Sequence, residues 1–201
     1  MSIDFDTLFD GRRVMAILRG LPPDETVAMA RAAWAGGVDL VEVPIGRPGQ
    51  EKALAAVVEA ARDGGHQVGA GTVVSSDHVR RAAEAGAVYT VAPGLDAQVL
   101  EASGSAGLPH LPGVATASEL QLAARLGCRW VKVFPASTLG PGWFKAMAGP
   151  FPDMRCVATG GVGVNEVGAY LRAGASVVGV GSALAEPESL ELLAEQIREA
   201  S

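Results

Sequence analysis

The chain contains 201 residues, of which 49% are hydrophobic and 19% charged, and this composition is typical of a globular protein rather than a disordered one. A net charge of −6 without any basic cluster argues against a nucleic-acid surface, but it leaves room for a locally positive pocket that binds a small anion. No apolar run is long enough to span a bilayer and the N-terminus lacks a signal-peptide pattern, so we expect no membrane partner and a cytoplasmic location.

Short apolar runs rich in β-branched residues alternate with alanine-rich segments along the whole chain. The runs predict strands at residues 14–18, 40–43, 67–70, 88–91, 110–111, 131–134, 156–158 and 177–180. Between them, helical periodicity predicts helices at 24–34, 51–62, 76–85, 117–126 and 165–172. Strands that alternate with helices indicate a parallel sheet, and eight of them favour a closed (β/α)8 TIM barrel, predicted here as one domain over residues 1–201.

A weak internal repeat supports the closed barrel. A glycine that ends a helix and precedes a strand recurs at intervals of 41 to 49 residues, at Gly37, Gly86, Gly127 and Gly174. These glycines precede every second strand, as expected of four βαβα quarters, and a left-handed helix cap explains the residue type.

Possible metal ligands are scattered along the chain. Cys128 and Cys156 lie far apart without a histidine at ligand spacing, and His66, His78 and His110 form no zinc pattern. We therefore predict no metal site, no cofactor and two reduced structural thiols.

In such a barrel the functional residues lie at the carboxyl ends of the strands. In chain order those ends supply Arg19, Glu42, Thr72, Pro93, Pro112, Lys132 with Phe134, Thr159, Gly160, Gly161, Gly181 and Ser182. Because all the strands of the barrel are parallel, we expect these residues to converge at one mouth.

Lys132 is out of place in an apolar strand. Side chains alternate between the two faces of a strand, so Lys132 shares its face with Trp130 and Phe134, whereas Val131 and Val133 face the other way. The ammonium is then expected between two aromatic rings, in surroundings that disfavour its charged form. A partly neutral lysine can attack a carbonyl to form a Schiff base, although these residues alone are explained as well by a lysine paired with a carboxylate or extended toward the strand end.

Glu42 faces the barrel interior by the same alternation, and a buried carboxylate needs a partner or a proton. It is a counter-ion of Lys132 or Arg19, a general acid and base, or both. Arg19 offers a bidentate clamp for a carboxylate or a phosphate, with a salt bridge at the rim as the alternative. Thr72 ends a glycine-containing strand that lets a ligand approach the backbone, although capping of the next helix explains it nearly as well.

Two glycine-rich turns follow the last two predicted strands. The first contains Thr159, Gly160 and Gly161, and the second contains Gly181 and Ser182. Backbone amides freed by glycines, together with a helix N-terminus and a hydroxyl, form a phosphate cradle, and many barrels bind phosphate at this place. Ordinary tight turns would explain one such motif, but two together predict a phosphate site.

These groups together fit a phosphorylated 2-keto acid. The phosphate cradle would hold one end and the carboxylate clamp the other, with the lysine and the glutamate between the two. A Schiff base between Lys132 and the keto group would withdraw electrons from the substrate. Glu42 could then accept the proton of the C4 hydroxyl, directly or through water, while the C3–C4 bond breaks and pyruvate forms.

With these residues, the chain resembles the 2-keto-3-deoxy-6-phosphogluconate (KDPG) and 4-hydroxy-2-oxoglutarate (KHG) aldolases. The matching segments follow in order at residues 16–19, 36–38, 41–43, 68–73, 92–94, 111–114, 131–135, 145–152, 158–162 and 179–182. They cover nearly the whole chain from Val14 onward. The resemblance implies a class I, Schiff-base aldolase on a (β/α)8 barrel, without a cofactor and assembled as a homotrimer.

The resemblance also implies a role for each candidate residue. Lys132 would be the Schiff-base lysine and Glu42 the acid and base, while Arg19 and Thr72 would hold the carboxylate derived from pyruvate. The pocket would be lined by Pro93 and Phe134, and the phosphate end would be served by Thr159, Gly160, Gly161, Gly181 and Ser182.

One position departs from the family pattern. Some members carry an arginine four residues after the glutamate, where this chain has Gly46 followed by Arg47, so either Arg47 replaces it or Arg19 suffices. The segments 43–45 and 139–141 resemble relatives that act on the galactonate epimer (KDPGal), whereas Thr159 resembles the gluconate enzymes. We predict KDPG as the substrate, with KDPGal as the alternative and KHG as a possible second substrate.

Three other classes compete with this interpretation. An isomerase or decarboxylase on a phosphate-binding barrel would use the same cradle but would not need Lys132. A metal-dependent pyruvate aldolase would need an acidic or histidine cluster, which the sequence does not show. A phosphate-binding protein without activity would not need both Lys132 and Glu42.

Overall fold

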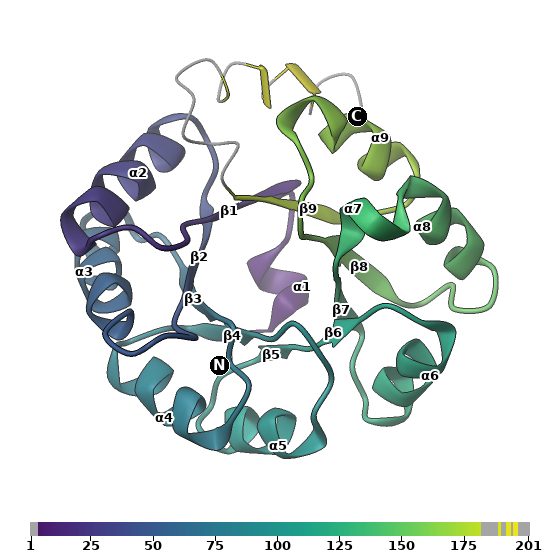
Figure 1. Cartoon of the computed structure of the whole chain (residues 1–201), viewed down its shortest axis with the longest axis horizontal. Coiled ribbons are helices and arrows are strands. Elements are labelled where there is room, and N and C mark those ends of the chain that lie inside the picture. The colour runs from purple at the N-terminus through teal and green to yellow at the C-terminus, as the bar shows by residue number, and fades with distance from the viewer. Residues whose placement is uncertain (1–3, 182–188, 190–191, 194, 197–201) are drawn as a thin grey trace.

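The computed structural model describes residues 4–181, 189, 192–193 and 195–196, and Ser182 lies outside them. Parallel strands form a barrel at the centre and helices surround it (Figure 1). The strands are β1 (Val14–Ile17), β2 (Leu40–Pro44), β3 (Val68–Gly71), β4 (Tyr89–Val91), β5 (His110–Leu111), β6 (Gly113–Val114), β7 (Trp130–Val133), β8 (Arg155–Ala158) and β9 (Val177–Val180). The (β/α)8 prediction is confirmed, with most predicted strand ends correct to within one residue.

The fifth strand position of the barrel is occupied by two short strands, β5 and β6, with Pro112 between them. β5 pairs with β4 on one side, and β6 pairs with β7 on the other. Proline has no N–H to donate to a ladder, so the strand is interrupted where Pro112 stands. The Pro112 carbonyl still accepts a hydrogen bond from the Lys132 N–H at 2.8 Å, which keeps the interrupted strand paired with β7.

The helices fill the intervals between the strands. They are α1 (Phe5–Leu8), α2 (Pro23–Ala35), α3 (Glu51–Ala61), α4 (Ser76–Glu84), α5 (Ala97–Ser105), α6 (Ala117–Arg125), α7 (Ala136–Leu139), α8 (Pro141–Ala148) and α9 (Val167–Arg172), with 3-10 turns η1 (Arg62–Gly64) and η2 (Val164–Glu166). The predicted helix at 165–172 is divided into η2 and α9. The sequence patterns did not predict α1, α5, α7 and α8.

Two apolar layers hold the barrel together. The outer layer lies between the strands and the helices and includes Val131, Val133 and Val43. The inner layer fills the barrel near the amino ends of the strands and includes Met15, Leu40 and other apolar side chains. Consecutive residues of one strand thus enter different layers, as strand geometry requires.

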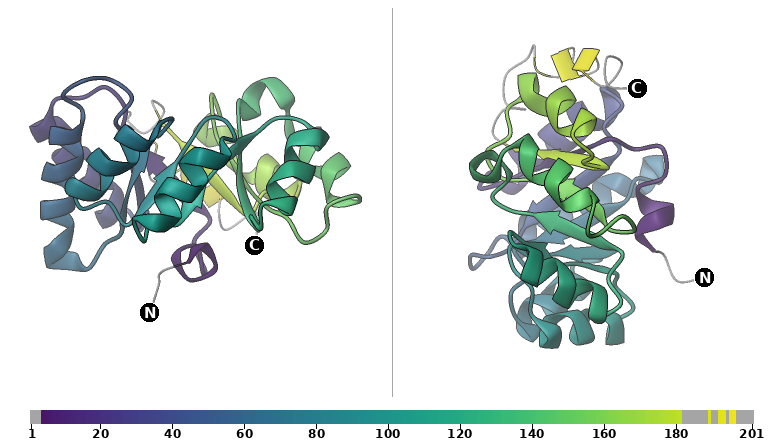
Figure 2. Two further views of the ribbon diagram at one scale, coloured as in Figure 1. Left: turned by 90° about the horizontal axis from the view of Figure 1, so that it is seen from below. Right: turned by 90° about the vertical axis from the view of Figure 1, so that its right-hand side faces the viewer.

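α1 closes the amino end of the barrel. It projects from one end of the sheet (Figure 2) and places Phe5 and Phe9 edge-on against Tyr89, at centroid distances of 6.0 and 6.4 Å. Phe9 also packs against Trp130 at 4.8 Å, and the indole N–H of Trp130 donates to Asp6 at 2.8 Å. Aromatic packing of this kind fills the inside of the barrel at the amino ends of the strands.

Candidate active site

Lys132 points into the barrel from β7, as its position in the strand predicted. Its side chain lies in the same face as Trp130, while Val131 and Val133 join the outer layer, and the residue is only 3% exposed. The ammonium lies 5.5 Å from the ring centroid of Phe134. Trp130 packs against Phe9 in the closed end instead, so the Phe134 ring is the aromatic partner of the ammonium.

Glu42 lies opposite Lys132 and reaches it across the barrel. The Oε1 atom of Glu42 is 3.7 Å from Nζ of Lys132, and Glu42 has no exposed surface. Neither carboxylate oxygen has a hydrogen-bond partner in the described part of the chain. A buried carboxylate without hydrogen bonds is costly, so this one is arranged for a partner that a ligand or water supplies.

The strand beside Glu42 has glycines at its inward positions, which leaves room for the Glu42 carboxylate. Glu42 stands next to β3, whose inward positions are Gly69 and Gly71. A Cβ atom at Gly71 would collide with the Glu42 carboxylate, and one at Gly69 would collide with the Tyr89 ring. Burial, with the nearby charge of Glu42, raises the pKa of Tyr89, whose hydroxyl donates to the Val41 carbonyl at 2.8 Å. The two glycines thus make room for the carboxylate and for the neutral phenol beneath it.

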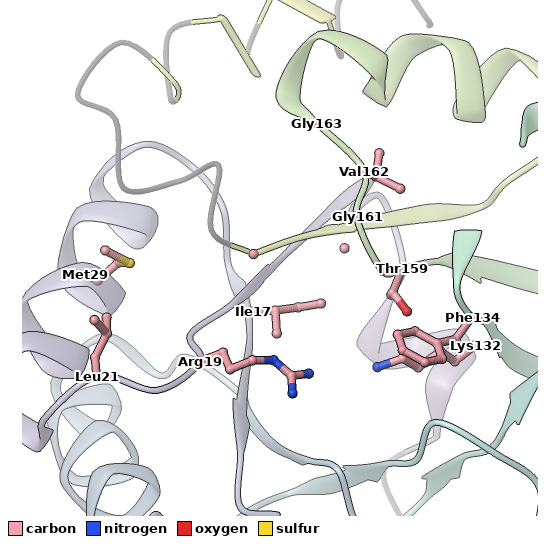
Figure 3. A pocket seen from close by; sticks show the side chains of 13 residues that line it. Ile17, Arg19, Leu21, Met29, Lys132, Phe134, Thr159, Gly161, Val162 and Gly163 are labelled. Carbon is pink, nitrogen blue, oxygen red and sulfur yellow. The ribbon is translucent and has the colours of Figure 1, made fainter. Parts of the chain in front are cut away.

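A cavity of about 490 Å³ opens above the pair formed by Lys132 and Glu42. Lys132, Phe134 and Thr159 line it from one side, and Arg19 lines it from the end of β1, with its guanidinium directed toward Lys132 (Figure 3). Arg19 forms no ion pair within the described residues, so the predicted alternative of a rim salt bridge is not observed. Its charge is therefore available to an anionic ligand.

Thr159 contributes a hydroxyl without a partner. The residue has no exposed surface, and Oγ1 makes no hydrogen bond with any described residue. A buried donor of this kind is satisfied when a ligand or a water molecule occupies the cavity. The sequence predicted Thr159 at the phosphate end, and the residue lines the cavity together with Lys132, Phe134 and the glycines that follow it.

The turn after β8 has the form expected of an anion cradle. Gly160 and Gly161 have φ angles of +96° and +75°, a region that favours glycine. The N–H groups of Gly160, Gly161 and Val162 donate to no acceptor in the part of the chain that the structure describes. Together with Gly163 and Gly181, these residues line the cavity, and the companion residue Ser182 lies outside the described residues. Free amides of this kind bind an anion.

Thr72 and Pro93 follow β3 and β4 at the same mouth but do not line the cavity. Thr72 has a φ angle of 59°, which is unusual for a β-branched residue. The side chain that caps α4 is that of Ser75, which accepts from the His78 N–H, so capping does not explain Thr72. Its hydroxyl makes no hydrogen bond with any described residue.

Arg47 lies away from the cavity. It is exposed in the loop after β2, where its N–H donates to Gln50, and it does not line the cavity.

One wall of the cavity is apolar and consists of Ile17, Leu21 and Met29, which the sequence analysis did not predict. Alternation along β1 could have found Ile17, but no sequence pattern marks Leu21 or Met29, because α2 brings Met29 there only when it packs on the barrel.

Two further observations concern partners. Within the described ranges, no helix is long and apolar enough to cross a membrane. In the same part of the chain, no three histidine, cysteine, aspartate or glutamate side chains are grouped so that they could share a metal ion.

Known proteins resemble the chain over most of its length. The family model described as KDPG and KHG aldolase matches residues 6–197. A 2-dehydro-3-deoxy-6-phosphogalactonate aldolase of Escherichia coli is 35% identical over 91% of this chain and 90% of its own length. A 2-dehydro-3-deoxy-phosphogluconate aldolase of Pseudomonas aeruginosa is 37% identical over 83% of this chain and 75% of its own. The KDPG aldolase of Legionella pneumophila, solved with pyruvate captured as a covalent carbinolamine, has a TM-score of 0.82 and 28% identity over 97% of both chains.

Proposed function

The chain belongs to the KDPG and KHG aldolase family and is a carbon–carbon lyase, and we propose that it cleaves 2-keto-3-deoxy-6-phosphogluconate to pyruvate and glyceraldehyde 3-phosphate through a Schiff base on Lys132. The observation that carries this proposal is the buried pair at the floor of the cavity, in which Nζ of Lys132 lies 3.7 Å from Oε1 of Glu42. The covalent pyruvate adduct named for the Legionella relative supports the same chemistry.

The reaction begins at Nζ of Lys132. The neutral amine attacks the C2 carbonyl, a carbinolamine forms, and loss of water gives a protonated imine. Glu42, whose Oε1 lies 3.7 Å from Nζ, accepts the ammonium proton after a small movement and returns it to the hydroxyl that leaves the carbinolamine as water, so its carboxylate is ionised again before cleavage. Phe134 covers the amine on one side and limits the access of water to it.

Cleavage follows from the positive charge of the imine. Glu42 accepts the proton of the C4 hydroxyl, the C3–C4 bond breaks, and its electron pair moves through C3 into the imine to give an enamine. Glyceraldehyde 3-phosphate leaves as the aldehyde. Protonation of the enamine at C3 and hydrolysis of the imine then release pyruvate and restore Lys132.

The remaining polar groups hold the two ends of the substrate. Arg19 carries an unpaired guanidinium at the cavity, and Thr72 carries an unpaired hydroxyl at the same mouth, so we assign them to the carboxylate. The free N–H groups of Gly160, Gly161 and Val162 bind the phosphate. Two separate groups of anion-binding residues suit a substrate with an anion at each end.

A second candidate substrate is the galactonate epimer. The E. coli relative that is 35% identical over most of the chain acts on 2-dehydro-3-deoxy-6-phosphogalactonate, according to its name. The epimers differ in the direction of the C4 hydroxyl, and the unpaired hydroxyl of Thr159 is a group that could distinguish them. We favour the gluconate substrate, and comparison of kcat/KM for the two epimers decides between them. Turnover of 4-hydroxy-2-oxoglutarate is measured in the same assay.

The mechanism is tested by trapping. Incubation with pyruvate and borohydride should reduce the imine and attach the three-carbon unit irreversibly to Lys132, where peptide mass spectrometry locates it. The Lys132→Ala variant should lose both the adduct and the cleavage activity, while the exposed Lys52→Ala variant keeps both. A folded Lys132→Ala protein that still cleaves the substrate would refute the assignment.

The homotrimer implied by the resemblance is a separate prediction, which light scattering of the purified protein checks.

A further inference from the structure

Tyr89 lies in β4 at the level where the Glu42 side chain leaves β2. Glu42 is in register with Gly69 of β3, and Gly69 is in register with Tyr89, so the three residues form one row across neighbouring strands. Residues in register point to the same face of a sheet, which here is the inside of the barrel. Because Gly69 has no side chain, Glu42 and Tyr89 share the space over it.

The ring of Tyr89 takes that space. A Cβ atom on Gly69 would collide with Cε2, Cζ and Cδ2 of the ring. The hydroxyl reaches across β3 and donates to the Val41 carbonyl of β2 at 2.8 Å. Phe5 and Phe9 pack edge-on against the ring from the closed end. The ring is therefore fully buried and held at both of its ends.

The carboxylate of Glu42 lies nearer to the open end than the ring does. A Cβ atom on Gly71, two residues after Gly69 in β3, would collide with Oε1 and Cδ of Glu42. The Glu42 side chain thus starts at the level of Gly69 and ends over Gly71, where Oε1 is 3.7 Å from Nζ of Lys132. The Tyr89 ring occupies the opposite direction, toward the closed end.

No hydrogen bond holds the carboxylate in its direction. Both oxygens of Glu42 are without a hydrogen-bond partner among the described residues, and Nζ of Lys132 at 3.7 Å is beyond hydrogen-bond distance. Packing must therefore fix the direction of the side chain, and Tyr89 supplies a large, rigid group behind it. Burial, and then the charge of Glu42, raises the pKa of Tyr89, so the phenol stays neutral beside the carboxylate.

We propose that Tyr89 is a positioning residue whose ring directs the Glu42 carboxylate toward Lys132. The ring fills the space on the side of the closed end, so the carboxylate stays within reach of the amine and of the substrate's C4 hydroxyl. The Tyr89 hydroxyl anchors the ring through the Val41 carbonyl and takes no part in the chemistry. This inference rests on the proposed function, in which Glu42 accepts protons.

The test compares Tyr89→Leu, which removes the ring, with Tyr89→Phe, which removes only the hydroxyl. Two quantities are measured on folded protein. They are kcat for cleavage, which depends on Glu42, and the pyruvate concentration that half-saturates borohydride trapping at Lys132. Tyr170→Leu is the matched control, because Tyr170 is also buried and donates to a backbone carbonyl, that of Ala136, at 3.0 Å, but packs in the outer layer.

Tyr89→Leu should lower kcat about 10–100-fold, because the carboxylate gains a second direction, and should change the half-saturating pyruvate concentration by less than about threefold. Tyr89→Phe and Tyr170→Leu should each keep kcat within about threefold of the wild-type value. In a Glu42→Gln background, Tyr89→Leu should lower kcat by less than about a further threefold, because the group that it positions is already absent.

Equal effects of Tyr89→Leu in both backgrounds, or a change mainly in the half-saturating pyruvate concentration, overturn the proposal. It is also overturned if Tyr89→Leu keeps kcat, or if Tyr89→Phe or Tyr170→Leu loses as much, because the ring is then not the cause. If Tyr89→Leu does not fold, Tyr89→Met takes its place. Failure of both to fold assigns Tyr89 a purely structural role and overturns the proposal as well. Absence of any adduct in the wild type would instead refute the proposed function itself.

Discussion

The two ends of the barrel are built on opposite principles, although one strand runs through both. β7 begins with Trp130 in the closed end, where its indole N–H is bonded to Asp6 and its ring packs against Phe9. Two residues later Lys132 reaches the open end, where the Glu42 carboxylate and the Thr159 hydroxyl have no hydrogen-bond partner in the described part of the chain.

The closed end mainly serves the stability of the fold, whereas the open end serves ligand binding and chemistry. The closed end buries aromatic surface and pairs the Trp130 indole N–H with Asp6, and both contribute to the free energy of folding. The open end keeps buried polar groups unsatisfied and therefore costs stability, which is typical of sites that are complementary to a ligand rather than to themselves. Substitutions at the two ends should consequently affect different measurements.

Among substitutions that keep Lys132, the largest effect is expected from Glu42→Gln at the open end. Glutamine keeps the shape but cannot accept the proton of the C4 hydroxyl, so turnover should fall by about 10²–10⁴-fold. Trapping of pyruvate on Lys132 should fall less, because the lysine is retained. Steady-state kinetics and borohydride trapping on the same preparation give the two numbers. Unchanged turnover would remove Glu42 from the mechanism.

Phe9→Ala probes the closed end. Phe9 is only 4% exposed, and its removal leaves a hole between α1, Tyr89 and Trp130. The free energy of unfolding should fall by about 3–5 kcal/mol, as measured by urea denaturation. At a temperature where the variant is folded, KM should stay close to the wild-type value. A large rise in KM with little loss of stability would contradict the separation of the two ends.

A smaller effect is expected in the barrel wall, at His110. Burial lowers the pKa of His110 to about 4, a shift that the charge of Asp96 partly offsets, and Nδ1 lies 2.8 Å from the Thr90 hydroxyl. Because the folded pKa lies below the unfolded value of about 6.5, the unfolded chain binds the proton more tightly. Stability should therefore be complete above pH 6.5 and decline by about 3 kcal/mol as the pH falls to 4.

Denaturant midpoints measured between pH 4 and 7.5 test this prediction. His110→Asn, which cannot titrate in this range, should lose most of the slope. Equal slopes in the wild type and the variant would mean that other groups cause the loss of stability in acid.

Much of the fold and of the candidate site follows from local patterns. The strands were predictable because β-branched runs end at glycine or proline, and the inward direction of Lys132 and Glu42 followed from the two-residue period of a strand. α1 was not predictable, because four residues with two phenylalanines carry no period of their own and are helical only while they pack inside the barrel. The aromatic partner of Lys132 was predicted only in part, since the same face of β7 holds two layers and Trp130 belongs to the lower one.

The amino-acid sequence by itself determined which side chains enter the barrel, because the alternation of faces is a property of the extended backbone. Only the tertiary structure decided which of them meet. The 3.7 Å approach of Glu42 to Lys132 depends on closure of the barrel between β2 and β7, and the room that Gly71 leaves for the Glu42 carboxylate depends on the register of β2 against β3. Distances between segments far apart in the chain are set by packing, and no local pattern carries them.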